Sequence, residues 1–189
     1  SDFAAFLSLL TGWEVPKPKE GRWGKAGIVT SASGCYSVGW RVLDDESAYI
    51  HRDGDSISIT GISFSEVLQE KRHSSNLPEI GIERAYNGLS SNTFNITISH
   101  IPQLWDNITE LGMADLTLSG HVHAMQIKLP IGKRGISPSQ IMHKRWSGLY
   151  EESGRWLYIN DGIGCAMWPM RIGVRPEITV IELVTAPHN

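Results

Sequence analysis

Residues 94–126, FNITISHIPQLWDNITELGMADLTLSGHVHAMQ, decide how the chain folds. The stretch predicts a short apolar strand that ends at Ser99, a helix that starts at Pro102 and ends near Gly112, and a second apolar strand that ends before Gly120. Two strands joined by one helix are usually parallel neighbours in a sheet. The residues that follow the two strands are therefore expected to lie side by side, although they are far apart in the sequence.

Three histidines follow these strands: His100, His121 and His123. A single histidine after a strand is most often a loop or capping residue. Alternate residues of a turn can face one centre, however, and Gly120 allows the backbone to bend there. Converging neutral imidazoles are ligands for divalent metals. The pattern predicts a metal site formed by the three histidines, and not a phosphate-binding loop.

Two motifs in this stretch, residues 99–102 (SHIP) and 118–126 (LSGHVHAMQ), resemble the last two metal-binding motifs of the calcineurin-like metallophosphoesterases. Further segments, residues 146–150, 157–164 and 169–179, resemble a bacterial branch of predicted phosphohydrolases that often carry a membrane-spanning leader. The resemblance covers residues 40–184, whereas residues 1–39 are rich in loop-forming residues and match poorly. Ala124 departs from the pattern, because family members more often have glycine there.

The resemblance implies an α/β fold, in which residues 1–189 form a single domain that is the C-terminal half of a four-layer β-sandwich with flanking helices. It implies hydrolysis of a phosphate ester by water, with two divalent ions (manganese, iron or zinc) that bind the phosphate oxygens. Carried over to this chain, His100 and His121 resemble ligands of one ion, and His123 resembles a ligand of the other. The substrate and the metal stay open.

The motifs of the family's first half are absent from the sequence. The chain has no Asp-x-His and no Gly-Asn-His, and its one Gly-Asp pair, Gly54-Asp55, is typical of a hairpin turn. We therefore expect this chain alone to bind one ion weakly or none, and to be inactive. Two explanations remain. Either the missing N-terminal half is its partner in a longer enzyme, or the chain is a degenerate relative, a non-catalytic module that packs against another domain.

Composition limits other functions. Seventeen basic and twenty acidic residues give a net charge of −3, which offers no electrostatic argument for binding nucleic acid. Cys35 and Cys165 are too few for a disulfide framework. The apolar run over residues 3–10 is too short to span a membrane and lacks the basic lead of a signal peptide. Any membrane leader is expected outside these residues, and localisation stays open.

The remaining patterns predict a hairpin of residues 48–51 and 57–60, a helix from Pro78 to about Leu89, a long loop over 128–145, loop-like sequence at 146–150, and strands at 155–159 and 178–184. Arg171 is expected either to bind a phosphate bidentately or to pair with Glu177 or Asp161. A half-sandwich leaves one surface of its sheet open, so homodimerisation through that surface is a further hypothesis.

Overall fold

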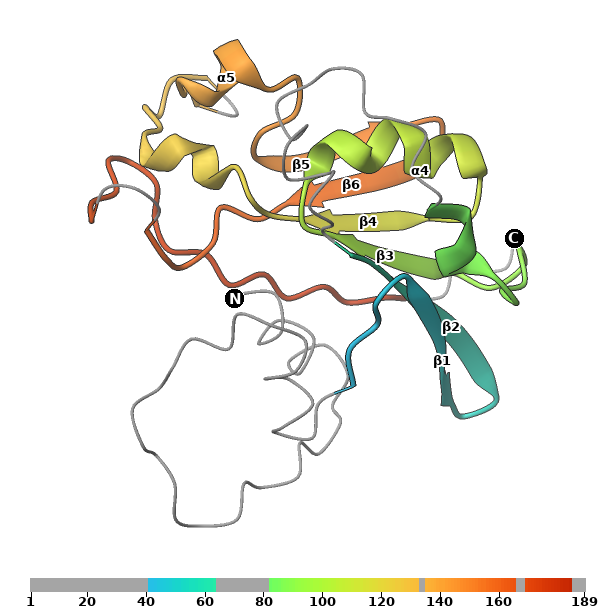
Figure 1. Cartoon of the computed structure of the whole chain (residues 1–189). Helices are drawn as coiled ribbons and strands as arrows, with labels where there is room; N and C mark the ends of the chain where they lie inside the picture. Colours follow the sequence, from blue (N-terminus) through green and yellow to red (C-terminus); the bar gives the residue numbers. More distant parts are fainter. Residues whose placement is uncertain (1–40, 64–81, 133–134, 166–168, 185–189) are drawn as a thin grey trace, which may run out of the picture.

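One mixed sheet of six strands organises the computed structural model, which describes residues 41–63, 82–132, 135–165 and 169–184. The strands lie in the order β1-β2-β3-β4-β6-β5 (Figure 1). Their bounds are β1 Glu46–Arg52, β2 Asp55–Ile62, β3 Asn95–Ser99, β4 Leu116–Ser119, β5 Gly148–Glu152 and β6 Arg155–Ile159. The fold is therefore α/β, with few helices.

The hairpin of β1 and β2 forms the first edge of the sheet. Arg52 pairs with Asp55, which leaves Asp53 and Gly54 as the two turn residues. Their φ angles are 51° and 91°, the left-handed values that a tight two-residue turn requires. The expectation of a hairpin turn at Gly54-Asp55 is confirmed: Gly54 is in the turn and Asp55 is the first residue of β2.

Parallel pairing holds the centre of the sheet together. β2, β3, β4 and β6 are parallel neighbours in that order, so their carboxyl ends meet at one edge of the sheet. In this register Ile98 lies beside Leu118, and Ser119 lies beside Ile159. The predicted parallel pairing of the strands before His100 and His121 is confirmed.

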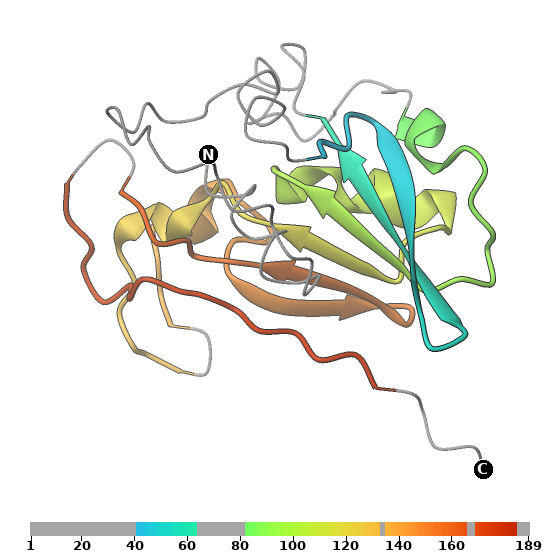
Figure 2. The same ribbon diagram turned by 90° about the horizontal axis from the view of Figure 1, so that it is seen from below.

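The helices cover one face of the sheet (Figures 1 and 2). A 3-10 turn, η2 Pro102–Leu104, leads into α4 Trp105–Leu111, and Gly112 ends the helix with a φ of 73°. A second 3-10 turn, η1 Ile82–Tyr86, lies on the same side. Their shared core consists of Ile62, Ile82, Ala85, Tyr86, Ile101, Leu104, Ile108 and Ala114. This packing fixes α4 between the two strands whose ends carry the histidines.

The opposite face is apolar and is crossed by the C-terminal segment, which runs extended beneath the sheet (Figure 1). Ile181 of this segment packs against the group of Ile96, Leu116 and Leu118. The predicted strand at 178–184 is wrong for the described residues, because no backbone ladder joins the segment to the sheet. Side chains attach it instead: Thr179 accepts from the Asn160 amide at 2.9 Å.

Three further expectations need correction. Residues 148–152 form β5, paired antiparallel with β6, whereas the sequence had suggested a loop. The helix expected from Pro78 is represented among the described residues only by η1, and the long loop contains one helical turn, α5 Ser139–Met142.

Residues 1–40, 64–81, 133–134, 166–168 and 185–189 lie outside the described parts of the chain. Within those parts, no helix has the length and apolar character needed to cross a membrane.

Candidate metal centre

The candidate site lies at the carboxyl edge of the parallel strands. His100 directly follows β3, and the segment of His121 and His123 follows β4. The Gly120 amide donates to the His100 carbonyl at 3.3 Å, which ties the two strand ends together. The site is thus positioned by the rigid centre of the sheet.

His100 and His121 face each other through ring nitrogens. Nδ1 of His121 lies 3.1 Å from Nε2 of His100, and the ring centres are 4.9 Å apart with planes at 65°. In the neutral state one nitrogen donates its proton to the other. Two imidazoles on one tetrahedral zinc ion, each at about 2.0–2.1 Å, hold their nitrogens about 3.3 Å apart. The observed nitrogen separation is therefore close to that of two ligands of a single cation.

Burial favours the neutral form of His100. Its pKa is lowered, first because desolvation disfavours the charged ring and also because the charge of His123 repels it. A neutral imidazole keeps a lone pair, which a metal ligand needs. Together with the geometry, this suits His100 to a metal site.

The backbone bends after Gly120 and not at it. His121 and His123 have φ angles of 67° and 49°, and the three residues 124–126 are also left-handed, whereas Gly120 is not among the glycines with positive φ. Non-glycine residues in this region cost of order 1–3 kcal/mol each unless packing holds them. Packing holds one of them here, because Ala124 is fully buried in a cluster with Val122, Trp146 and Val174. The expected role of Gly120 as the bend is wrong.

His123 points elsewhere. Its Nδ1 lies 3.1 Å from the carbonyl oxygen of Asp161, in the turn that follows β6. Among the described residues, no group of three or more His, Cys, Asp and Glu side chains is arranged to hold one ion. The structure thus brings His100 and His121 together and directs Nδ1 of His123 to a separate contact. The assignment of the three histidines as metal ligands stays a prediction.

Asp161 is a candidate site residue that the sequence pattern does not single out. Its Oδ2 accepts from the Ser147 hydroxyl at 3.0 Å and lies 3.3 Å from the Lys128 ammonium. Its Oδ1 is buried and has no hydrogen-bond partner among the described residues. One signal could have found it: Asp161 follows β6, the next parallel strand after the two that carry histidines.

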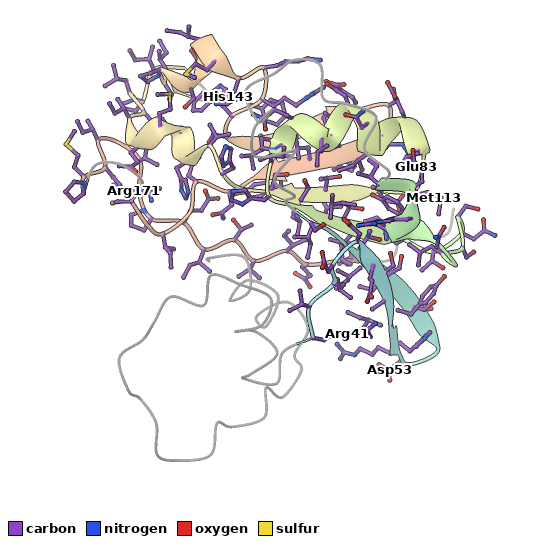
Figure 3. The ribbon with its side chains drawn as sticks, in the orientation of Figure 1. Arg41, Asp53, Glu83, Met113, His143 and Arg171 are labelled. Atoms are coloured by element: carbon purple, nitrogen blue, oxygen red, sulfur yellow. The ribbon has the colours of Figure 1, made fainter. Side chains whose placement is uncertain are left out.

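Arg171 lies on the extended segment at the end of the molecule that carries η3 His123–Gln126 (Figure 3). Its Nε donates to the Val174 carbonyl at 3.2 Å, its NH2 group to the Asp161 carbonyl at 2.6 Å, and its NH1 group to the Gly164 carbonyl. All three guanidinium nitrogens therefore hold backbone. The alternative of a phosphate contact stays a prediction, and these contacts favour a structural role.

Curated proteins similar to this chain carry metallophosphoesterase or phosphodiesterase names. An uncharacterized metallophosphoesterase, YkuE of Bacillus subtilis (strain 168), is 35% identical over 50% of this chain and 32% of its own length. The phosphodiesterase YaeI of Escherichia coli (strain K12) is 35% identical over 37% of this chain and 25% of its own length. A transmembrane protein with metallophosphoesterase domain from Bos taurus is 30% identical over 72% of this chain and 30% of its own length.

These relatives indicate the class of protein to which the chain is similar, the metallophosphoesterases. The matched part of this chain spans about a third or less of each of the three proteins. No family model matches the chain, and no solved structure does. The matches support the C-terminal part of a metallophosphoesterase, and the mixed α/β sheet is compatible with that fold.

Proposed function

We propose that the chain is the C-terminal segment of a metal-dependent phosphoesterase that hydrolyses a phosphate ester with a metal-activated water. The observation that carries the proposal is the pair of ring nitrogens of His100 and His121, 3.1 Å apart at adjacent parallel strand ends. The names of two relatives, a metallophosphoesterase and a phosphodiesterase, support it.

The proposed ligands divide between two ions. His100 and His121 hold one ion, and His123 contributes to the other, with the remaining ligands supplied by an N-terminal segment that this sequence does not contain. When bound, the ions lower the pKa of water and neutralise charge that develops on the phosphoryl oxygens. The chain's own contribution is a set of imidazoles that follow adjacent parallel strands of the sheet. Without the missing ligands, we expect no turnover by this chain alone.

The apolar face opposite α4 supports the proposed partner. Leu149 and Trp156 are 48% and 43% exposed there, on the two strands at one edge of the sheet. We propose that this face meets the N-terminal half of the same domain. In the isolated chain it could instead pair with a second copy, and a stable monomer in sedimentation would count against that dimer.

The decisive experiment compares two forms of the protein: these 189 residues and a longer product of the reading frame that includes the upstream segment. With manganese, the longer form is expected to hydrolyse an aryl phosphate, and His121→Ala to abolish that hydrolysis. His51→Ala is the matched control. His51 is exposed on β1 and pairs with Ser56 near the start of β2, whereas the candidate histidines follow the carboxyl ends of β3 and β4. An upstream segment without acidic metal motifs would defeat the proposal.

A second candidate is a non-catalytic folded module. The absence of a three-ligand group among the described residues favours it. This reading predicts no turnover by either form and unchanged folding when the three histidines are replaced together. Metal-dependent hydrolysis by the longer form excludes it.

A further inference from the structure

We propose that the turn formed by Asp161, Gly162, Ile163 and Gly164 sets the tautomer and position of the His123 ring, and that Arg171 is a positioning residue that acts through this turn. The functional importance of this arrangement rests on the proposed function, in which His123 is a metal ligand. The geometry itself does not depend on metal, so the two ideas can fail separately.

The contact between His123 and Asp161 fixes where the proton lies. Nδ1 of His123 lies 3.1 Å from the backbone carbonyl oxygen of Asp161. A carbonyl only accepts, so the hydrogen bond requires a proton on Nδ1. In the neutral ring Nε2 then carries the lone pair. This arrangement, in which the second nitrogen of a histidine donates to a carbonyl, is the usual support of a metal-binding imidazole.

Gly162 provides the space that the ring occupies. A Cβ atom at this position would lie 2.7 Å from both Cε1 and Nδ1 of His123. The φ angle of Gly162 is 72°, which independently disfavours any other residue. The imidazole therefore rests directly on the backbone of the turn, and a single methyl group would displace it.

Arg171 holds the accepting carbonyl. Its NH2 group donates to the Asp161 carbonyl at 2.6 Å, and the other two guanidinium nitrogens donate to the carbonyls of Gly164 and Val174. The carbonyl oxygen of Asp161 has two lone pairs, and it serves two donors, Arg171 and His123. The arginine thus fixes both ends of the turn relative to the extended segment.

The amide side of the turn is fixed by other residues. The Asp161 amide donates to Oε2 of Glu177 at 2.9 Å, and the Gly162 amide donates to Oδ1 of Asn160 at 2.6 Å. The turn is therefore held from both sides. Because these contacts remain when Arg171 is changed, the arginine can be tested without removing every support of the turn.

The test is a long-range ¹H–¹⁵N correlation spectrum of the imidazoles in the metal-free chain, which reports the tautomer of each histidine. In the native chain we expect His123 in the Nδ1–H form. Gly162→Ala and Arg171→Lys are expected to mix the two tautomers at His123 and to leave the His51 signals unchanged. Lysine keeps the charge of Arg171 but cannot reach three carbonyls.

Matched controls separate positioning from general damage. Gly154→Ala carries the same left-handed strain, with a φ of 76°, but a Cβ there meets nothing within 4 Å. Arg175→Lys changes an exposed arginine on the same segment. Both should leave His123 unchanged.

Two results overturn the proposal: an Nε2–H tautomer at His123 in the native chain, or an unchanged His123 signal in folded Arg171→Lys. If Gly162→Ala does not fold, the native spectrum and Arg171→Lys still decide. Failure of the longer form to hydrolyse phosphate would defeat the proposed function and leave the tautomer result standing.

Discussion

The ammonium nitrogen of Lys128 lies 3.3 Å from Oδ2 of Asp161, whose side chain is only 8% exposed. The Ser147 hydroxyl bridges the two: it accepts from Lys128 at 3.0 Å and donates to Asp161 at 3.0 Å. A buried carboxylate is costly unless it is paired and hydrogen-bonded. Lys128 thus pairs with a buried carboxylate at the edge of the candidate metal centre.

Removing the lysine should leave that charge without its partner. We expect Lys128→Met to lower the free energy of unfolding by about 1–3 kcal/mol, less than for a fully buried pair because Lys128 is a quarter exposed. Chemical denaturation measures the change. Lys144→Met, at an exposed position, should have little effect. The double variant with Asp161→Asn should recover part of the loss, and a strictly additive double variant would contradict the pairing.

The imidazole pair predicts a measurable metal affinity. Calorimetric titration of this chain with zinc is expected to show weak binding that depends on both His100 and His121, because their facing nitrogens already lie near the spacing of two ligands on one ion. His121→Ala should lower the affinity by at least about tenfold. His51→Ala should not change it. Equal binding by the His121→Ala variant would show that zinc binds elsewhere.

The centre of the fold follows from the sequence, because local signals and long-range contacts agree there. The strand before His100, the helix ended by Gly112 and the strand before Gly120 each carry their own hydrophobic period and stop signal, and a strand–helix–strand unit permits few arrangements. The pairing of His100 with His121 follows from that unit.

The rest of the site depends on partners that sequence patterns do not reveal. β5 is an edge strand whose aromatic and glycine residues are typical of a loop. Its extended conformation depends on its pairing with β6. The direction of His123 depends on the carbonyl of Asp161, which is far along the chain and whose side chain plays no part in the contact. The role of Arg171 likewise depends on backbone atoms.

Acid should weaken the link between the start of β1 and the end of β2. Asp45 accepts from the amide and the hydroxyl of Ser63, both at 2.8 Å, and pairs with Arg84. Burial alone raises the pKa of Asp45, but the Ser63 bonds and the Arg84 charge outweigh it and hold the pKa below its usual 3.8. The stabilisation is therefore complete above that value and is lost as the pH falls through the lower folded-state pKa.

We expect Asp45→Asn to lower the free energy of unfolding by about 1–2 kcal/mol near neutral pH. The difference from the native chain should shrink as the pH falls below 3.8, where the aspartate becomes protonated in the unfolded state and then in the folded state. Denaturation curves over this pH range test the idea. Asp55→Asn, at the exposed first residue of β2, is the control. A difference that stays constant with pH would contradict the assigned charge.

A buried polar network joins β1, β2, β3 and η1 beneath the helices. The Asn95 amide donates to Ser58 at 3.0 Å and to Thr60 at 2.8 Å, and its Oδ1 accepts from Thr97 at 2.7 Å. Since the Thr97 proton is used in that bond, Tyr86 must donate to Thr97, at 2.8 Å. Burial raises the pKa of Tyr86 to about 12, which keeps this phenol protonated and able to donate.

The position of each residue in this network predicts an order of effects. Asn95→Val leaves Ser58, Thr60 and Thr97 without their shared partner in a buried setting, so we expect a loss of about 2–4 kcal/mol in the free energy of unfolding. Tyr86→Phe removes only the last donor, because Thr97 keeps its bond to Asn95, and should cost about 1 kcal/mol. Asn92→Ala, at an exposed position, should cost less than about 0.5 kcal/mol. If Tyr86→Phe costs as much as Asn95→Val, Asn95 is not the centre of the network and the proton directions assigned to it are wrong.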